Sequence, residues 1–173
     1  FLGSDWSLEL SGTRHPHAEV VSTVIDQLEL DTVVSTDGTD RHQARVQVRS
    51  AGEQFLVISL PPKSVLWSLM VGQDQVKPVR SGRNQLRVPL PVNEQGGTAT
   101  EVLVIYQTPG SIWKGSGKEK LVPIKFAEEI PVMKSNWRLH LPEGYDYKRF
   151  RSTLQKQFQI NERIFLGHIA NKW

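Results

Sequence analysis

The sequence contains no cysteine among its 173 residues, and this absence excludes a whole group of sites. Disulfide frameworks, thiolate zinc sites, iron–sulfur clusters and thiol nucleophiles all require that residue. Long apolar runs are lacking as well, because no stretch approaches the roughly 18 apolar residues that a membrane-spanning helix needs. No Asn-x-Ser/Thr sequon occurs either, so nothing indicates a glycosylated ectodomain.

What the chain does contain is typical of a folded domain. Its hydrophobic residues make up 38% of the sequence, which is too many for a disordered segment. The chain opens at Phe1 without an initiator methionine, so we expect a piece of a longer protein or a processed product. The net charge of +3 is unevenly distributed, since residues 1–110 carry a net charge of −3 and residues 111–173 a net charge of +6. A surface for an anionic partner or a plain solvated loop and helix face would both explain that bias.

Apolar and polar residues alternate through most of the chain, as a strand with one buried face requires. The clearest case is residues 28–50, where Ala44, Val46 and Val48 alternate with polar neighbours and a turn at 36–38 separates two runs. Gly38 can supply the positive φ that a tight turn needs. This stretch predicts a β-hairpin.

Further runs of the same kind follow at intervals of about 8–12 residues, a spacing typical of antiparallel β-structure. They cover residues 55–60, 65–71, 75–79, 86–90 and 101–106. The sequence therefore predicts a mainly β fold, an antiparallel β-sandwich that is immunoglobulin- or fibronectin-like in architecture, with a C-terminal helical extension.

The pattern also suggests how the chain is divided. We expect residues 1–110 to form the β-sandwich and residues 111–120 an exposed loop or linker. Residues 121–145 then add strands that either complete the sandwich or begin a second related unit. Residues 146–173 form the helical extension, with the helix near 146–159, because apolar side chains there are spaced three, four and four apart, at Tyr147, Phe150, Leu154 and Phe158.

Residues that could carry catalysis form no recognisable motif. The close pair His15 and His17 lacks a third metal ligand and is better explained as a polar loop. His42 and His168 have no companion at a recognisable spacing, and His140 is expected on the solvated face of its strand. No nucleophile elbow or phosphate loop occurs. We therefore expect no enzyme, no cofactor and no metal, although a hydrolase site assembled by the fold stays an alternative.

The tryptophans suggest where a partner could bind. Trp6, Trp67 and Trp137 lie in strand-like runs and are predicted to be core residues, whereas Trp113 lies in a polar stretch. The candidate contact surface therefore comprises Ile112, Trp113 and Lys114, and, from the predicted helix, Tyr147, Phe150 and Leu154. Because sugars stack on exposed indoles, a carbohydrate-binding module of a secreted enzyme is an alternative. No strand interleaves aromatic and basic residues, so no nucleic-acid partner is expected.

Three segments together resemble a known kind of protein. Residues 55–67 (FLVISLPPKSVLW), 71–78 (VGQDQVKP) and 86–91 (LRVPLP) precede a strand that ends in Val104-Ile-Tyr106. This succession resembles β-rich repeat segments of large uncharacterised bacterial envelope-associated proteins. The resemblance implies a location in the periplasm, in the cell envelope or outside the cell. It also implies an architectural or adhesive role. We therefore expect a non-enzymatic interaction or spacer module whose partners are other domains of the same parent protein or separate proteins, with a glycan as the partner that the tryptophans would allow.

Overall fold

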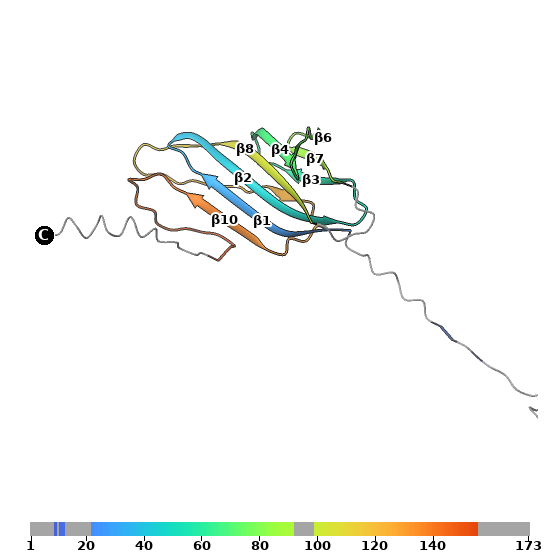
Figure 1. Cartoon of the computed structure of the whole chain (residues 1–173). Helices are drawn as coiled ribbons and strands as arrows, with labels where there is room; N and C mark the ends of the chain where they lie inside the picture. The colour runs from blue at the N-terminus through green and yellow to red at the C-terminus, as the bar shows by residue number, and fades with distance from the viewer. Residues whose placement is uncertain (1–8, 10, 13–21, 92–98, 156–173) are drawn as a thin grey trace, which may run out of the picture. The chain divides into compact units, whose positions relative to one another are not determined.

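A computed structural model describes residues 9, 11–12, 22–91 and 99–155, and it shows a mainly β chain (Figure 1). The described residues form two β-sheets and contain no helix. The chain divides into two compact units, Phe1–Pro142 and Glu143–Trp173, and all described strands belong to the first. In the described part, no helix is long and apolar enough to cross a membrane.

The larger sheet, called sheet A, has six strands in the order β10-β1-β2-β8-β4-β5. Figure 1 shows β10, β1, β2 and β8 side by side in one layer. The strands of sheet A are β1 (Thr23–Val33), β2 (Asp37–Ser50), β4 (Val65–Val71), β5 (Asp74–Gln75), β8 (Thr100–Ile112) and β10 (Ser135–His140).

The smaller sheet, sheet B, has four strands in the order β6-β7-β3-β9. Its strands are β3 (Phe55–Ser59), β6 (Val79–Arg80), β7 (Gln85–Pro89) and β9 (Lys125–Phe126). All its pairings are antiparallel. Because β9 joins sheet B and β10 joins sheet A, the segment that follows residue 120 contributes one strand to each sheet.

The hairpin predicted for residues 28–50 is confirmed as the antiparallel pair β1–β2. Gly38 has a φ of 88°, a conformation that side-chain-bearing residues rarely adopt. The register of β2 against β8 shifts between Asp37 and Thr39, so the glycine lies at an irregularity of the ladder. β8 itself continues to Ile112, so the first two residues of the loop or linker predicted for residues 111–120 belong to a strand.

One pairing in sheet A is parallel. β10 lies beside β1 in a register that runs from Leu28 opposite Ser135 to Val33 opposite His140. All other strand pairs are antiparallel. The edge strand β10 is therefore distant in sequence from its neighbour β1.

A single apolar core lies between the two sheets. Alternate residues of β2 and β8 in sheet A and of β3 and β7 in sheet B point into it, as strands with one dry face require. Nine of its residues have no exposed surface: Ile25, Ala44, Val46, Leu56, Ile58, Val88, Val102, Val104 and Tyr106. Burial of this shared surface is the main source of the fold's stability.

The helix expected near residues 146–159 is absent from its described part. Residues 145–155 contain no helix, and Arg149 has a φ of 60°, in the left-handed region that interrupts an α-helix. The Leu154 amide donates to the Ser152 side chain instead of to a helical carbonyl. Helices depend mainly on packing of their apolar face, so periodicity alone did not suffice. Positions 156–159, including Phe158, lie outside the described residues.

Candidate functional site

A hydrogen-bonded chain of polar side chains crosses the inner face of sheet A. The Trp137 indole nitrogen on β10 donates to the Thr32 hydroxyl on β1 at 2.8 Å. That hydroxyl lies 2.9 Å from Nδ1 of His42 on β2, and Nε2 of His42 lies 2.8 Å from the Thr108 hydroxyl on β8. Four strands of sheet A are thereby linked through side chains as well as through their backbones.

The neutral His42 imidazole fits this chain in either tautomer. With its proton on Nε2 the ring donates to Thr108, and Nδ1 accepts from Thr32; with its proton on Nδ1 it donates to Thr32, and Nε2 accepts from Thr108. In both cases the Thr32 oxygen accepts from Trp137. His42 is 2% exposed, and burial lowers the pKa of its imidazole to about 4. This histidine therefore stays uncharged and structural near neutral pH.

Tyr106 stacks on this histidine and continues the buried polar region. Its ring lies 4.6 Å from the His42 ring between centroids, at an interplanar angle of 15°. The Tyr106 hydroxyl is fully enclosed, and the backbone of Ile124 approaches it without the geometry of a full hydrogen bond. Burial raises the pKa of Tyr106 well above its usual range, so the phenol keeps its proton.

Asp40 is the buried carboxyl group of the region. It is 1% exposed and accepts a hydrogen bond from the Ser35 amide at 3.2 Å. Burial raises the pKa of Asp40, while the Ser35 bond opposes that shift. Its carboxyl lies against Gly110 so closely that a Cβ there would come within 2.7 Å of Oδ2. A glycine in β8 is therefore what makes room for this acid.

The outer face of sheet A differs from the inner face. In the half formed by β10, β1 and β2, acidic and basic side chains pair with one another. Arg49 forms a two-pronged contact with Asp26, at 2.6 and 2.7 Å. Arg45 lies between Glu29 and Glu101, and Arg138 contacts Asp31 at 2.9 Å and Glu29 at 4.0 Å. Acidic and basic side chains alternate from strand to strand, so this half of the face carries little net charge.

The other half of that face, over β8 and β4, is richer in apolar side chains. Leu103 and Ile105 alternate with inward-facing residues of β8, opposite Met70 and Ser68 of β4. Val65 and Trp67 extend the area and are 50% and 52% exposed. We call Val65, Trp67, Met70, Leu103 and Ile105 the apolar stripe.

Trp67 was predicted to lie in the core, and that prediction is wrong. It is the extra residue at the register shift between Leu66 and Ser68, where the alternation of β4 is interrupted. The bulge places its ring under the Arg41 guanidinium, at 5.8 Å from the ring centroid. Trp137, in contrast, is partly buried against the core as expected.

The predicted contact residues from the 112–114 segment lie together at the end of β8. Ile112 is 66% exposed, Lys114 is exposed, and Trp113 is partly buried with its amide donating to the Thr36 carbonyl at 3.2 Å. A shallow hollow is lined by Ile112, Trp113 and residues 115–118, but not by Lys114. The segment is held against the β1–β2 turn rather than hanging free.

The other predicted contact residues belong to the second unit. Phe150 and Leu154 are 37% and 38% exposed, and Tyr147 is partly buried. Lys148 pairs with Asp146 at 2.6 Å. These side chains do not form the helical stripe that was predicted for them.

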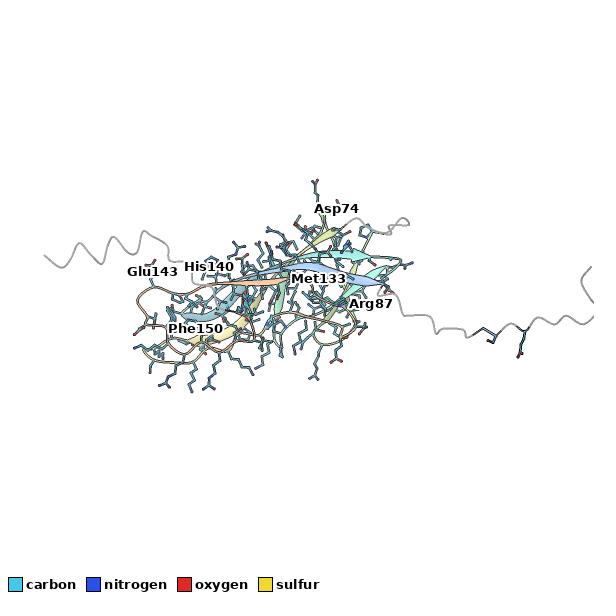
Figure 2. The ribbon with its side chains drawn as sticks, turned by 90° about the horizontal axis from the view of Figure 1, so that it is seen from below. Asp74, Arg87, Met133, His140, Glu143 and Phe150 are labelled. Carbon is cyan, nitrogen blue, oxygen red and sulfur yellow. The ribbon has the colours of Figure 1, made fainter. Side chains whose placement is uncertain are left out.

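The segment from the turn before β4 to β7 carries cations without matching acids. Between residues 63 and 87 the chain has five basic residues but only one acidic residue, Asp74. Figure 2 shows Asp74 and Arg87 projecting at well-separated places. Among the described residues, no carboxylate forms an ion pair with the five, Arg87 instead lying over the Phe55 ring at 4.6 Å. The net charges of residues 1–110 and 111–173 did not reveal this local excess of basic residues.

Two observations bear on catalysis and metal binding. In the described ranges, no group of three or more His, Asp or Glu side chains could hold a metal ion. One hollow is lined by residues 111–113 and 115–118 and another by residues around Arg80, Arg83 and Ser64, and the groups with strongly shifted pKa values line neither. His140 is exposed on β10 as expected, while His15, His17, His168 and Trp6 lie outside the described residues.

Comparison with known proteins identifies no family. No family model matches the sequence, and no curated protein matches it. Among solved structures, an M1 zinc metallopeptidase from Deinococcus radiodurans matches 52% of this chain and 21% of its own length, with 14% identity and a TM-score of 0.44. An aminopeptidase A from Legionella pneumophila matches 52% and 11%, with 13% identity and a TM-score of 0.42. The chain thus spans about a fifth or less of these proteins, and likenesses this distant assign it no activity.

Proposed function

We propose that this chain is a non-enzymatic interaction or spacer module of a larger envelope-associated or secreted bacterial protein, with an immunoglobulin- or fibronectin-like β-sandwich architecture. The observation that carries the proposal is the divided outer face of sheet A. One half neutralises its own charges, and the other half carries the apolar stripe, in which Val65 and Trp67 are about half exposed and the other three side chains are partly buried. Exposed apolar area bordered by polar residues is characteristic of surfaces that contact other proteins.

The composition of the stripe favours a polypeptide as its partner. Trp67 and Arg41 are the residue types that contribute most to protein interfaces, and here they are stacked on each other. The stacked guanidinium retains donors for a carboxylate or carbonyl of the partner. Such a partner is another domain of the same parent protein or a separate protein.

Site-directed crosslinking tests this function. Because the chain has no cysteine, Ser68→Cys gives a single attachment point for a benzophenone on the outer face of sheet A. In envelopes of the producing bacterium we expect a crosslink to one defined polypeptide site, competed by excess unlabelled chain. We also expect it to be lost on Trp67→Ser. A Val57→Cys label on sheet B is the control and should not give that crosslink.

Absence of a competable crosslink at Ser68→Cys, or one that persists in Trp67→Ser, would refute the protein-interaction function. Fractionation of the same cells tests the location, since the proposal requires the protein in the envelope, periplasm or medium. Recovery in the cytoplasm alone would contradict it.

The exposure of Trp67 also favours a second candidate, a carbohydrate-binding module. A half-exposed indole on a sheet face is a surface on which a sugar ring can stack. Arg41 already lies over the indole, so a sugar would have to use the free part of the ring or displace the guanidinium. A glycan array separates the two functions, because tight sugar binding that disappears in Trp67→Ala would favour the carbohydrate-binding module over the protein-interaction module.

A further inference from the structure

The strands that open and close the first unit's described fold are direct neighbours. β1 is its first strand and β10 its last, and Figure 1 shows the two arrows side by side and pointing the same way. Their register pairs every residue from Leu28 to Val33 with one from Ser135 to His140. An isolated bridge between Ile25 and Val132 extends the contact toward the start of β1.

This arrangement determines how tension along the chain would act. The chain enters β1 at Thr23 and leaves β10 at His140, and in a parallel pair these two points lie at opposite ends. A pull on the chain before β1 and after β10 therefore drags the strands past each other along their axes. The hydrogen bonds between them run across that direction, so they resist together instead of opening one after another.

The contact is reinforced along its length. Backbone bonds join Met133 N to the Ile25 oxygen at 2.8 Å and Val34 N to the His140 oxygen at 2.9 Å, near the two ends of the pair. Side chains add the Trp137 bond to Thr32 and the Arg138 ion pair with Asp31. Sliding would have to break all of these contacts, several of them sheltered from water.

We propose that the β1–β10 pair is a mechanical clamp, which keeps the first unit folded when tension runs along the polypeptide. This inference rests on the proposed function, because a spacer between other domains is the kind of module that carries such tension. It gives the spacer a specific physical property, namely resistance to extension that is greater along this direction than along others.

Single-molecule force spectroscopy on the whole chain tests the clamp. The cysteine-free sequence permits defined attachment points, and Ser22→Cys with Glu143→Cys loads β1 and β10 in shear. The control pair is Ser22→Cys with Ala51→Cys. Ala51 N donates to the Ser22 oxygen, so this second pair peels the β1–β2 hairpin open from one end. At equal loading rate, we expect a several-fold higher unfolding force in the shear geometry.

A backbone variant localises the resistance to the proposed pair. Met133 is 70% exposed, and Met133→Pro removes the amide that bonds to Ile25 with little loss of packing. We expect a lower unfolding force in the shear geometry and an unchanged force in the peeling geometry. Met133→Ala, which keeps the amide, is the matched control and should match the parent chain in both.

Equal forces in the two geometries, or no effect of Met133→Pro, would refute the clamp. These outcomes are independent of the crosslinking and glycan experiments. A high unfolding force in shear without a competable crosslink would overturn the interaction function but support the clamp. A low unfolding force in shear with a defined crosslink would support the interaction function but overturn the clamp.

Discussion

At the scale of single residues, the stability of the fold depends on the protonation states of three buried side chains. His42 completes its hydrogen bonds as a neutral ring, Tyr106 keeps its phenolic proton, and burial favours the protonated form of Asp40. Burial thus favours the uncharged form of each side chain, although the Ser35 hydrogen bond opposes this effect at Asp40. The pH dependence of stability should report on them.

Acid should destabilise the fold through His42. Its pKa is about 4 in the folded chain and about 6.5 when unfolded, so below pH 6.5 the unfolded chain takes up a proton that the fold refuses. The loss of stability between pH 7 and pH 4 should reach about 3 kcal/mol. Urea unfolding of the parent chain and of His42→Gln at several pH values measures it.

The difference between those two chains isolates the histidine, because the raised pKa of Asp40 contributes with the opposite sign and is present in both. His42→Gln should lose less stability over this pH range. Parallel pH profiles in the two chains would show that His42 is not the titrating group.

The contact between Gly110 and Asp40 gives a second prediction. In Gly110→Ala, the new Cβ would lie 2.7 Å from a buried carboxylate oxygen that has no room to retreat, so we expect a loss of about 1–3 kcal/mol. Gly117→Ala is the matched control, since no atom lies within 4 Å of its added Cβ. Chemical denaturation of both variants measures the effect, and equal stabilities would contradict this steric account.

At the scale of elements, β10 is held in sheet A by its contacts with β1. Trp137→Phe keeps a ring in place but removes the donor to Thr32, so we expect a loss of about 1–3 kcal/mol. Amide hydrogen exchange should accelerate most in residues 133–140. Arg138→Gln, which changes an exposed ion pair, serves as control and should cost less than about 1 kcal/mol. Acceleration spread evenly over all strands would show that β10 is not a separately held element.

The same strand shows what could and could not be predicted from the sequence. Alternation located the β1–β2 hairpin, because Ala44, Val46 and Val48 mark a dry face through local spacing alone. It could not identify the partner of β10, since Thr32 and Trp137 are 105 residues apart.

Three other failures have the same origin, because each depends on contacts that local spacing does not contain. His42 had no visible companion, since its partners are ten and 66 residues away. The bulge at Trp67 interrupts β4, and the irregular chain around Arg149 interrupts the predicted helix, whereas the sequence pattern assumed that both elements were continuous. The apolar stripe, the main candidate surface, was therefore missed.

At the scale of the whole first unit, its two sheets share one core and should unfold together. Ile58→Ala in β3 should cost about 2–5 kcal/mol by leaving a cavity between the sheets. It should accelerate global-opening hydrogen exchange in β2 of sheet A as much as in β7 of sheet B. Val57→Ala on the outer side of the same strand is the control, expected to cost far less. Acceleration of hydrogen exchange in sheet B alone would indicate that the two sheets are independently stable.

The late position of β10 also affects how the protein is made. While the chain emerges from the ribosome, β1 can pair with β2 early, but its other edge finds its partner only after the residues near 140 have appeared. Until then, a row of backbone donors and acceptors is open to neighbouring nascent chains, which is a recognised route to aggregation. Truncated translation products that end before Ser135 should therefore be the ones that require chaperones.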